Sequence, residues 1–103
     1  MNQFCLVGKI ASLPDLAVSK SGWKSCNVLL EVERPFTNSK GIYESDLINL
    51  EVWRGAAETL CAAARLGSWI TARGRIQASR PHEREGTSNP CYTLVAEKIE
   101  YIH

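Results

Sequence analysis

A single run of helical spacing, set among runs of two-residue spacing, is the feature that most constrains the fold of this chain. Five segments are rich in strand-forming residues or alternate between apolar and polar side chains, which is the period of a β-strand. These segments are residues 2–10, 24–34, 47–54, 68–78 and 91–102. In residues 55–66 alanine is frequent, and apolar residues recur at intervals of three and four, as in a helix. Gly67 follows where a glycine commonly ends a helix.

This order of elements predicts an all-β fold of the OB type, a five-stranded Greek-key barrel with one short helix between strands 3 and 4. Another small barrel or an open α+β sheet would contain the same elements. A chain of 103 residues has room for one modest core, so we expect a single OB-fold domain over residues 1–103.

Turn-forming and polar residues divide the strands. Residues 19–22 predict a turn, and residues 35–46 and 80–90 predict two long polar loops. Two glycines lie inside predicted strands: Gly8 indicates a bulge or tight bend, and Gly74 a bend or a close approach of two backbones.

Several functional classes are excluded by what the sequence lacks. No apolar run approaches the roughly 18 residues of a membrane span, so we expect no membrane partner. Nucleotide-cradling and hydrolase motifs are absent, and His82 and His103 have no nucleophile or metal-ligand set near them. We therefore expect no enzyme, with no catalytic residues, no metal and no cofactor. The four cysteines lack a C-x-x-C motif and predict free, mostly buried thiols.

Charge is distributed unevenly, although the formal net charge is only +1. Residues 65–84 contain five arginines and one acid, Glu83, whereas residues 31–64 contain six acids and three basic residues. A near-neutral total does not exclude a polyanionic partner, because the local potential beside a basic stripe matters more than the sum.

Two tryptophans are predicted to point outward near arginines. The inner faces of two strands are predicted to be Ile48, Leu50 and Val52, and Ile70, Ala72, Gly74 and Ile76. The opposite faces then hold Trp53, next to Arg54, and Trp69, on the same face as Arg73 and Arg75. Bases stack on indole rings and guanidinium groups bind phosphates, so this pattern favours sequence-tolerant binding of single-stranded nucleic acid. In the alternative interpretation, a loop or a subunit interface covers both tryptophans.

Nearly the whole chain, from Asn2 to Tyr101, resembles the bacterial single-stranded DNA-binding protein family. The matching stretches are LVGKI at 6–10, RPFTNSKG at 34–41, DLINLEVWRGAAETL at 46–60, LGSWITARGRIQ at 66–77, EG at 85–86 and AEKIEYI at 96–102. Each is loose alone, but their order and spacing are specific. The resemblance implies an OB barrel that binds single-stranded DNA without strong sequence preference in DNA replication, recombination or repair. It also implies a cytoplasmic, nucleoid-associated protein.

The resemblance further implies which residues contact DNA. Trp53 falls on a stacking aromatic of the family, and Phe36 lies in the loop where another is usual. The arginines at or beside positions that contact the DNA backbone are Arg34, Arg54, Arg73 and Arg75. Arg80, from the arginine-rich segment, and Trp69 complete the predicted DNA-binding set.

Members of the family usually assemble as homotetramers, so a homotetramer is expected in preference to a dimer. The first strand pairs across the family's dimer interface, and it is apolar on both faces here. The expected interface residues are Phe4, Cys5, Leu6 and Val7.

Two departures from the family pattern keep other functions open. Leu47 and Pro81 stand where the family generally has a stacking aromatic. The chain also stops at the barrel, without the acidic tail that recruits repair and replication enzymes, so a short form without such recruitment is expected. The alternatives are a dimeric OB module resembling primosomal replication protein B, which S-x-S-G-x-x-x-C at 19–26 would suit, and a protein-interaction OB module with weak DNA affinity.

Overall fold

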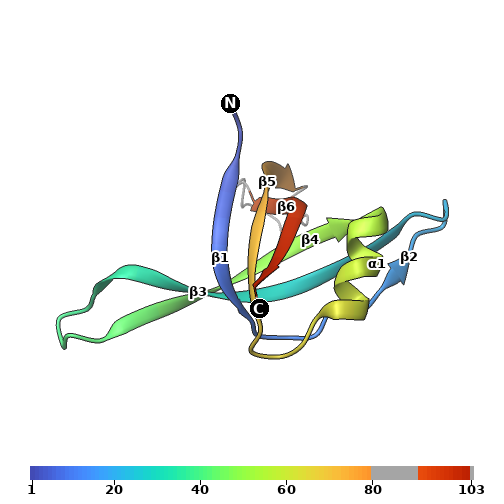
Figure 1. Ribbon diagram of the computed structural model, residues 1–103. Coiled ribbons are helices and arrows are strands. Elements are labelled where there is room, and N and C mark those ends of the chain that lie inside the picture. The colour runs from blue at the N-terminus through green and yellow to red at the C-terminus, as the bar shows by residue number, and fades with distance from the viewer. Residues whose placement is uncertain (80–90, 103) are drawn as a thin grey trace, which may run out of the picture.

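The computed structural model describes residues 1–79 and 91–102, which form six strands and one helix (Figure 1). These are β1 (Phe4–Ile10), β2 (Ala17–Val18), β3 (Lys24–Thr37), β4 (Tyr43–Trp53), α1 (Arg54–Ala63), β5 (Trp69–Ser79) and β6 (Cys91–Ile102). All except β2 correspond to the predicted elements, and α1 lies between the third and fourth of the predicted strands, as expected. The two-residue β2 was not predicted, because a strand this short has no alternation to recognise.

The strands form one sheet that closes on itself. The order is β1-β5-β6-β4-β3-β2, and an additional pairing of β1 with β3 closes the barrel. β4 and β6 run parallel, which the intervening helix makes possible. Gly8 lies where β1 passes from β5 to β3, and a Cβ there would be 2.5 Å from the carbonyl oxygen of Glu31. The irregularity predicted at Gly8 corresponds to this crossing.

The core consists of the predicted inner faces of the strands together with one face of α1. The fully buried large side chains are Ile10, Cys26, Val28, Leu30, Leu50, Val52, Leu60 and Ile70. One inner-face prediction is wrong: Ile76 is 38 % exposed. It lies past the buried part of β5, beyond the last residue pair with β1. There the Asn2 side chain bonds to the backbone N–H and carbonyl of Ile76 on the side where β1 has ended.

The segment predicted as a long loop, residues 35–46, is mostly strand. β3 and β4 extend through it, with a register irregularity between Glu33 and Thr37, and leave a turn at 38–42. The Asn38 side chain accepts hydrogen bonds from the backbone N–H groups of Lys40 and Ile42, which fixes this turn. The resulting hairpin projects away from the barrel on the left of Figure 1. The radius of gyration is accordingly 15.2 Å, compared with about 13 Å for a compact domain of 100 residues.

The helix ends earlier than predicted. Its last residue is Ala63, and Ala64 caps it with a backbone hydrogen bond to Leu60. Gly67 is therefore not the helix cap: it occupies the left-handed region (φ +80°) of the following turn and donates its N–H to Ile10. α1 packs on β3, β4 and β6. No helix in the described ranges is long and apolar enough to cross a membrane.

The four cysteines are free, as expected, but they are not mostly buried. Cys26 is buried and Cys61 is half-buried, whereas Cys5 and Cys91 are exposed. Burial raises the pKa of the Cys26 thiol to about 12, and the neighbouring Cys61 adds to the shift.

Candidate nucleic-acid interface

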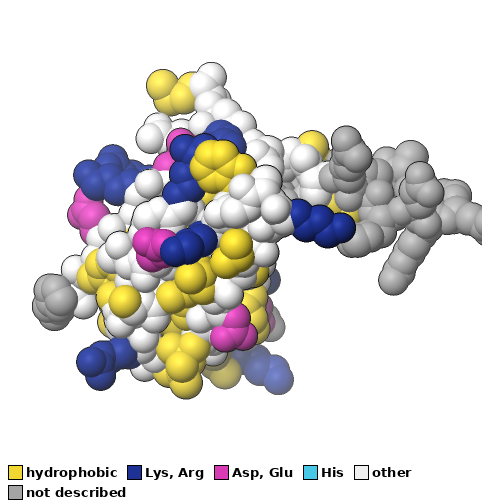
Figure 2. All heavy atoms as spheres, turned by 90° about the vertical axis from the view of Figure 1, so that its right-hand side faces the viewer, with side chains coloured by type: hydrophobic (Ala, Val, Ile, Leu, Met, Phe, Trp, Pro, Cys, Tyr) yellow, Lys and Arg dark blue, Asp and Glu magenta, His cyan; other side chains and the backbone are white. Residues whose placement is uncertain are grey.

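An open groove of about 750 Å³ runs over the end of the barrel where β4 meets α1. Its walls come from β4, α1, β5, β6 and the turn that precedes β3. The lining residues are Trp23, Glu51, Trp53, Arg54, Ala56, Arg75, Gln77, Val95, Ala96 and Glu97. Figure 2 turns the end of the molecule that carries α1 and β2 toward the viewer, and there Lys and Arg side chains lie beside hydrophobic ones. The groove thus combines aromatic and cationic side chains.

Trp53 is the last residue of β4 and lies on the outer face, as the alternation predicted. Its side chain is 39 % exposed, and the indole N–H donates a hydrogen bond to the Glu51 carboxylate two residues earlier on the same face. The hydrogen bond holds one edge of the indole against the Glu51 side chain. The indole is therefore oriented in the groove while its surface remains open to a ligand.

Arg54 is held in the groove by an unusual backbone conformation. Its φ is +59°, and it is the one non-glycine residue with positive φ in the described part of the chain. Left-handed conformations cost a non-glycine residue roughly 1–2 kcal/mol. The guanidinium lies over the Trp23 ring, 4.1 Å from the ring centroid, which is within the range of a cation–π contact.

The opposite wall of the groove is built around a β-bulge. Between Arg73 and Gly74 the pairing of β5 with β6 shifts by one residue, and Glu97 is the extra residue. A Cβ on Gly74 would be 1.8 Å from the carbonyl oxygen of Val95, so the close approach predicted there is confirmed. Arg75 lies beside the bulge, 3.8 Å from the Glu97 carboxylate, and donates a hydrogen bond to Gln77.

A second hollow of about 300 Å³ continues from the first. Both are lined by Glu97, and the second is also lined by Arg73 and Lys98. These two cationic residues are direct cross-strand partners on β5 and β6. Because the bulge leaves both Glu97 and Lys98 exposed, the surface from Trp53 to Arg73 is one continuous track that carries Arg75, Arg73 and Lys98.

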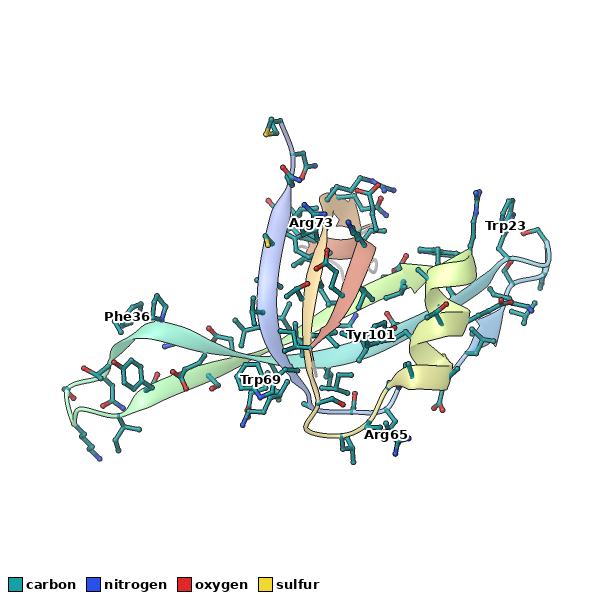
Figure 3. The ribbon with its side chains drawn as sticks, in the orientation of Figure 1. Trp23, Phe36, Arg65, Trp69, Arg73 and Tyr101 are labelled. Carbon is teal, nitrogen blue, oxygen red and sulfur yellow. The ribbon has the colours of Figure 1, made fainter. Side chains whose placement is uncertain are left out.

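Other predicted DNA-binding residues lie away from the groove. Figure 3 places Phe36 on the projecting hairpin and Trp69 at the far end of β5 from Arg73. Trp69 stacks under Lys9, with 5.5 Å from the ammonium to the ring centroid. The Arg34 guanidinium is paired with two acidic side chains: it donates hydrogen bonds of 2.8–3.0 Å to Asp46 and of 2.8 Å to Glu44. The Arg34 guanidinium also holds the pKa of Asp46 below its ordinary value.

The predicted loop 80–90 and His103 fall outside the described residues. The loop includes Arg80, predicted to bind DNA, Pro81, which replaces a usual aromatic, and His82. Leu47, the other replacement, is on the outer face of β4 and 63 % exposed. Its side chain belongs to the same strand face as Trp53 but does not line the groove.

Trp23 is a groove residue that the sequence predictions missed. It directly precedes β3 and has the same parity as Ser25, whose partner across the sheet is Trp53. Extending the outer parity of the 24–34 segment back by one residue would have placed Trp23 outward. Trp23 lies near Trp53 because of the register of β3 against β4. Alternation within one strand does not specify this register.

The first strand divides its apolar residues between two faces. Phe4 is buried and Leu6 packs against the core, whereas Cys5 and Val7 are exposed. Across β5 and β6 the exposed face continues with Trp69 and Ile102. Of the four residues expected at an oligomer interface, Cys5 and Val7 are therefore the ones that a partner could contact on this outer face.

Acidic, histidine and cysteine side chains in the described ranges form no group of three or more that could hold a metal ion. The titratable residues of the groove are paired with one another or with aromatic side chains: Glu51 with Trp53, Arg54 with Trp23, and Arg75 with Glu97. The groove thus presents two indole rings beside charged groups that already have partners within the chain.

Comparison with known proteins gives a consistent result. The model of the single-strand binding protein family matches residues 1–102. The chain is 32 % identical to the single-stranded DNA-binding protein of Oceanobacillus iheyensis over 99 % of its own length and 63 % of that relative. It is also 32 % identical to single-stranded DNA-binding protein B of Bacillus subtilis over 98 % of its own length and 89 % of that relative. The chain thus spans less than two thirds of the first relative and most of the second.

A solved structure shares the fold. It is a deletion mutant of the single-stranded DNA-binding protein from Thermus aquaticus, which matches with a TM-score of 0.80. The match covers 100 % of this chain and 51 % of that chain, at 22 % sequence identity. The predicted OB-type barrel with one helix is thereby confirmed.

Proposed function

The chain belongs to the single-strand binding protein family, and from this premise we propose that it binds single-stranded DNA in the groove of Trp53, Arg54 and Arg75. The family is not one of enzymes, which agrees with the prediction of no enzyme. Binding occurs without strong sequence preference, because stacking and phosphate contacts do not read base edges. The proposed setting is DNA replication, recombination or repair.

The observation that carries this proposal is the position of an open indole between two arginines from different elements. Trp53 comes from β4, Arg54 from the start of α1 and Arg75 from β5, and all three line one groove. Aromatic faces stack on bases, and guanidinium groups bind the backbone between them.

The charges of the groove support a division of roles. Two arginines and two glutamates line it, so the groove itself has no net positive charge to attract a phosphate to its centre. The adjoining hollow is lined by two cations, Arg73 and Lys98, and one acid, Glu97. Lys98 lies 3.4 Å from the Glu100 carboxylate, so Arg73 is the cation of this hollow without an acidic partner among the described residues. Bases therefore stack inside the groove on Trp53, while phosphates follow the track along β5 and β6.

We further propose a homo-oligomer, a tetramer in preference to a dimer, assembled through the outer face of β1. Cys5 and Val7 on β1, and Trp69 and Ile102 beside them, give this face exposed apolar side chains on neighbouring strands. Exposed apolar side chains on neighbouring strands are typical of a subunit contact. None of these residues lines the groove of Trp53.

The test is a fluorescence-anisotropy titration with a labelled oligo-dT and with a duplex of the same length, each at several salt concentrations. We expect tighter binding of the single strand and a linear fall of log affinity with log salt. Each phosphate contact contributes about −0.7 to the slope for a single strand. Arg75→Ala should therefore make the slope less steep by about 0.7.

Equal affinity for duplex and single strand would contradict the proposal. Absence of binding to either would instead favour the protein-interaction module that the sequence left open. The guanidinium of Arg34 is already paired with Asp46 and Glu44. We therefore expect this residue of the hairpin to contribute little to DNA affinity.

A further inference from the structure

Trp23 is an exposed tryptophan on a rigid support. The backbone N–H of Trp23 donates to the Ser19 hydroxyl at 3.0 Å, and its carbonyl accepts from the Ser19 N–H at 2.8 Å. Gly22, with φ +86°, completes the turn by donating its N–H to the Ser19 carbonyl. The indole is nevertheless 46 % exposed. Its backbone is thus fixed while a large part of the ring faces solvent.

Arg54 is positioned against this ring at a cost. The left-handed φ of +59° is a strained conformation for arginine. Within the described ranges its guanidinium forms no ion pair, and its contact is with the Trp23 ring, 4.1 Å away. The cations beside it differ, since Arg75 has Glu97 and Lys24 has Glu58 as acidic partners. Strain without a neutralising acid is typical of a residue that serves a ligand.

We infer that Trp23 and Arg54 form a second stacking surface, which holds an additional nucleobase of the single strand in the same groove as Trp53. This inference rests on the proposed function and extends it to a residue at which the family resemblance implies no aromatic. An indole and a guanidinium in contact offer a planar surface for a base, and the N–H groups at the edge of the guanidinium remain able to bind a phosphate.

The extra surface accounts for how the chain binds without two usual aromatics. Leu47 is aliphatic and exposed on the same strand as Trp53. Trp23 lies at the other end of that face, diagonal to Trp53 through the Ser25–Trp53 pair. We therefore expect the bound DNA strand to extend from Trp53 toward the β2–β3 turn and α1, on the right-hand side of Figure 3, where Trp23 is labelled.

The first test compares the affinity of three proteins for oligo-dT by anisotropy. Trp23→Ala should weaken binding about 5- to 150-fold, the range for the loss of one stacked base. Leu66→Ala is the control for the loss of a large exposed side chain, because Leu66 is 64 % exposed and lies between α1 and β5, outside both the groove and the proposed assembly face. A general loss of stability would affect both variants, whereas the loss of a stacked base affects Trp23→Ala alone.

The second test reads Trp23 directly. The chain has three tryptophans, so the double variant Trp53→Phe, Trp69→Phe leaves Trp23 as the one emitter. Oligo-dT should quench this emission at saturation, whereas the variant that retains only Trp69 should show no quenching. Arg54→Lys keeps the charge but loses the planar group, so it should lower affinity several-fold and leave the salt slope unchanged.

The outcomes separate this inference from the function on which it rests. If the wild-type protein binds no single strand, the proposed function fails and the inference with it. If the wild type binds and Trp53→Ala weakens it, but Trp23→Ala does not and Trp23 emission stays constant, the second stacking surface is refuted while the function stands.

Discussion

At the scale of the residue, the groove depends on one strained backbone position. Arg54 has φ +59° at the junction of β4 and α1, and this conformation turns the chain so that Trp53 and Arg54 both reach the groove. Residues in rare conformations persist where the surrounding structure determines them, and they concentrate at binding sites. Affinity and stability are therefore expected to oppose each other at position 54.

Two substitutions at this position separate the strain from the side-chain contact. Both Arg54→Ala and Arg54→Gly remove the cation–π contact with Trp23, but glycine alone accepts positive φ without strain. We expect Arg54→Gly to be more stable than Arg54→Ala by about 1 kcal/mol, although both lose DNA affinity. Urea denaturation of the two variants measures the difference. Equal stabilities would mean that position 54 is not strained.

The sequence revealed part of the groove for physical reasons that can be stated. Alternation places Trp53 and Arg75 on outer faces because side-chain direction in a strand is a local property. The neighbourhood of Trp23 and Trp53 depends on the register of β3 against β4, which local patterns do not encode. The capture of Arg34 by Asp46 likewise depends on a pairing across the hairpin.

At the scale of the element, the bulge in β6 organises the cationic track. Because Glu97 is inserted opposite the Arg73–Gly74 step, both Glu97 and Lys98 point outward. Gly74 permits the bulge, since it leaves room for the carbonyl oxygen of Val95.

Gly74→Ala should therefore destabilise the protein and weaken DNA binding. The new Cβ would be 1.8 Å from the Val95 oxygen, so the strands must separate, which costs about 1–3 kcal/mol by analogy with overpacked cores. Gly55→Ala is the matched control, because a Cβ there meets nothing within 4 Å. The control lies in α1, where alanine should stabilise by up to about 1 kcal/mol. Thermal unfolding of both variants gives the comparison. A Gly74→Ala variant with the same Tm as the wild type would contradict the role of the bulge.

Most of the fold could be predicted because its elements follow local periodicity. β3, β4, β5, β6 and α1 carry a pattern of period 2 or 3.6 in their buried parts, and β1 is recognisable by its strand-forming residues. The sequence predicts too long a loop for this hairpin of β3 and β4, at residues 35–46, because Pro35, Asn38 and Gly41 are turn-forming residues. Those residues in fact shape a register irregularity and a tight turn, while cross-strand contacts such as Arg34 with Glu44 keep the arms paired.

At the scale of the whole molecule, the two faces of the barrel have separate uses. The groove lies at the β4–α1 junction, and its lining residues differ from the exposed apolar residues of β1, β5 and the end of β6. The cationic track borders this apolar face at Arg73, the cross-strand partner of Cys5. The groove is therefore available for DNA while Val7, Trp69 and Ile102 are available for assembly.

Assembly through β1 predicts that Cys5 is protected although it is exposed in the single chain. Cys5 should react slowly with a maleimide in the native protein, whereas Cys91, also exposed, should react quickly. Cys26, whose pKa is raised by burial to about 12, should stay unreactive. Light scattering should give about four times the 11.4 kDa mass of the chain. A mass of one chain, together with rapid labelling of Cys5, would reject the assembly.

The most direct measurement of the central claim is a titration of Trp53→Ala and Trp69→Ala with oligo-dT, followed by both anisotropy and tryptophan emission. The account predicts that Trp53→Ala loses about 1–3 kcal/mol of binding free energy and much of the quenching, whereas Trp69→Ala keeps both. If Trp69→Ala abolishes binding and quenching while Trp53→Ala leaves them unchanged, single-stranded DNA does not bind in the groove at the β4–α1 junction.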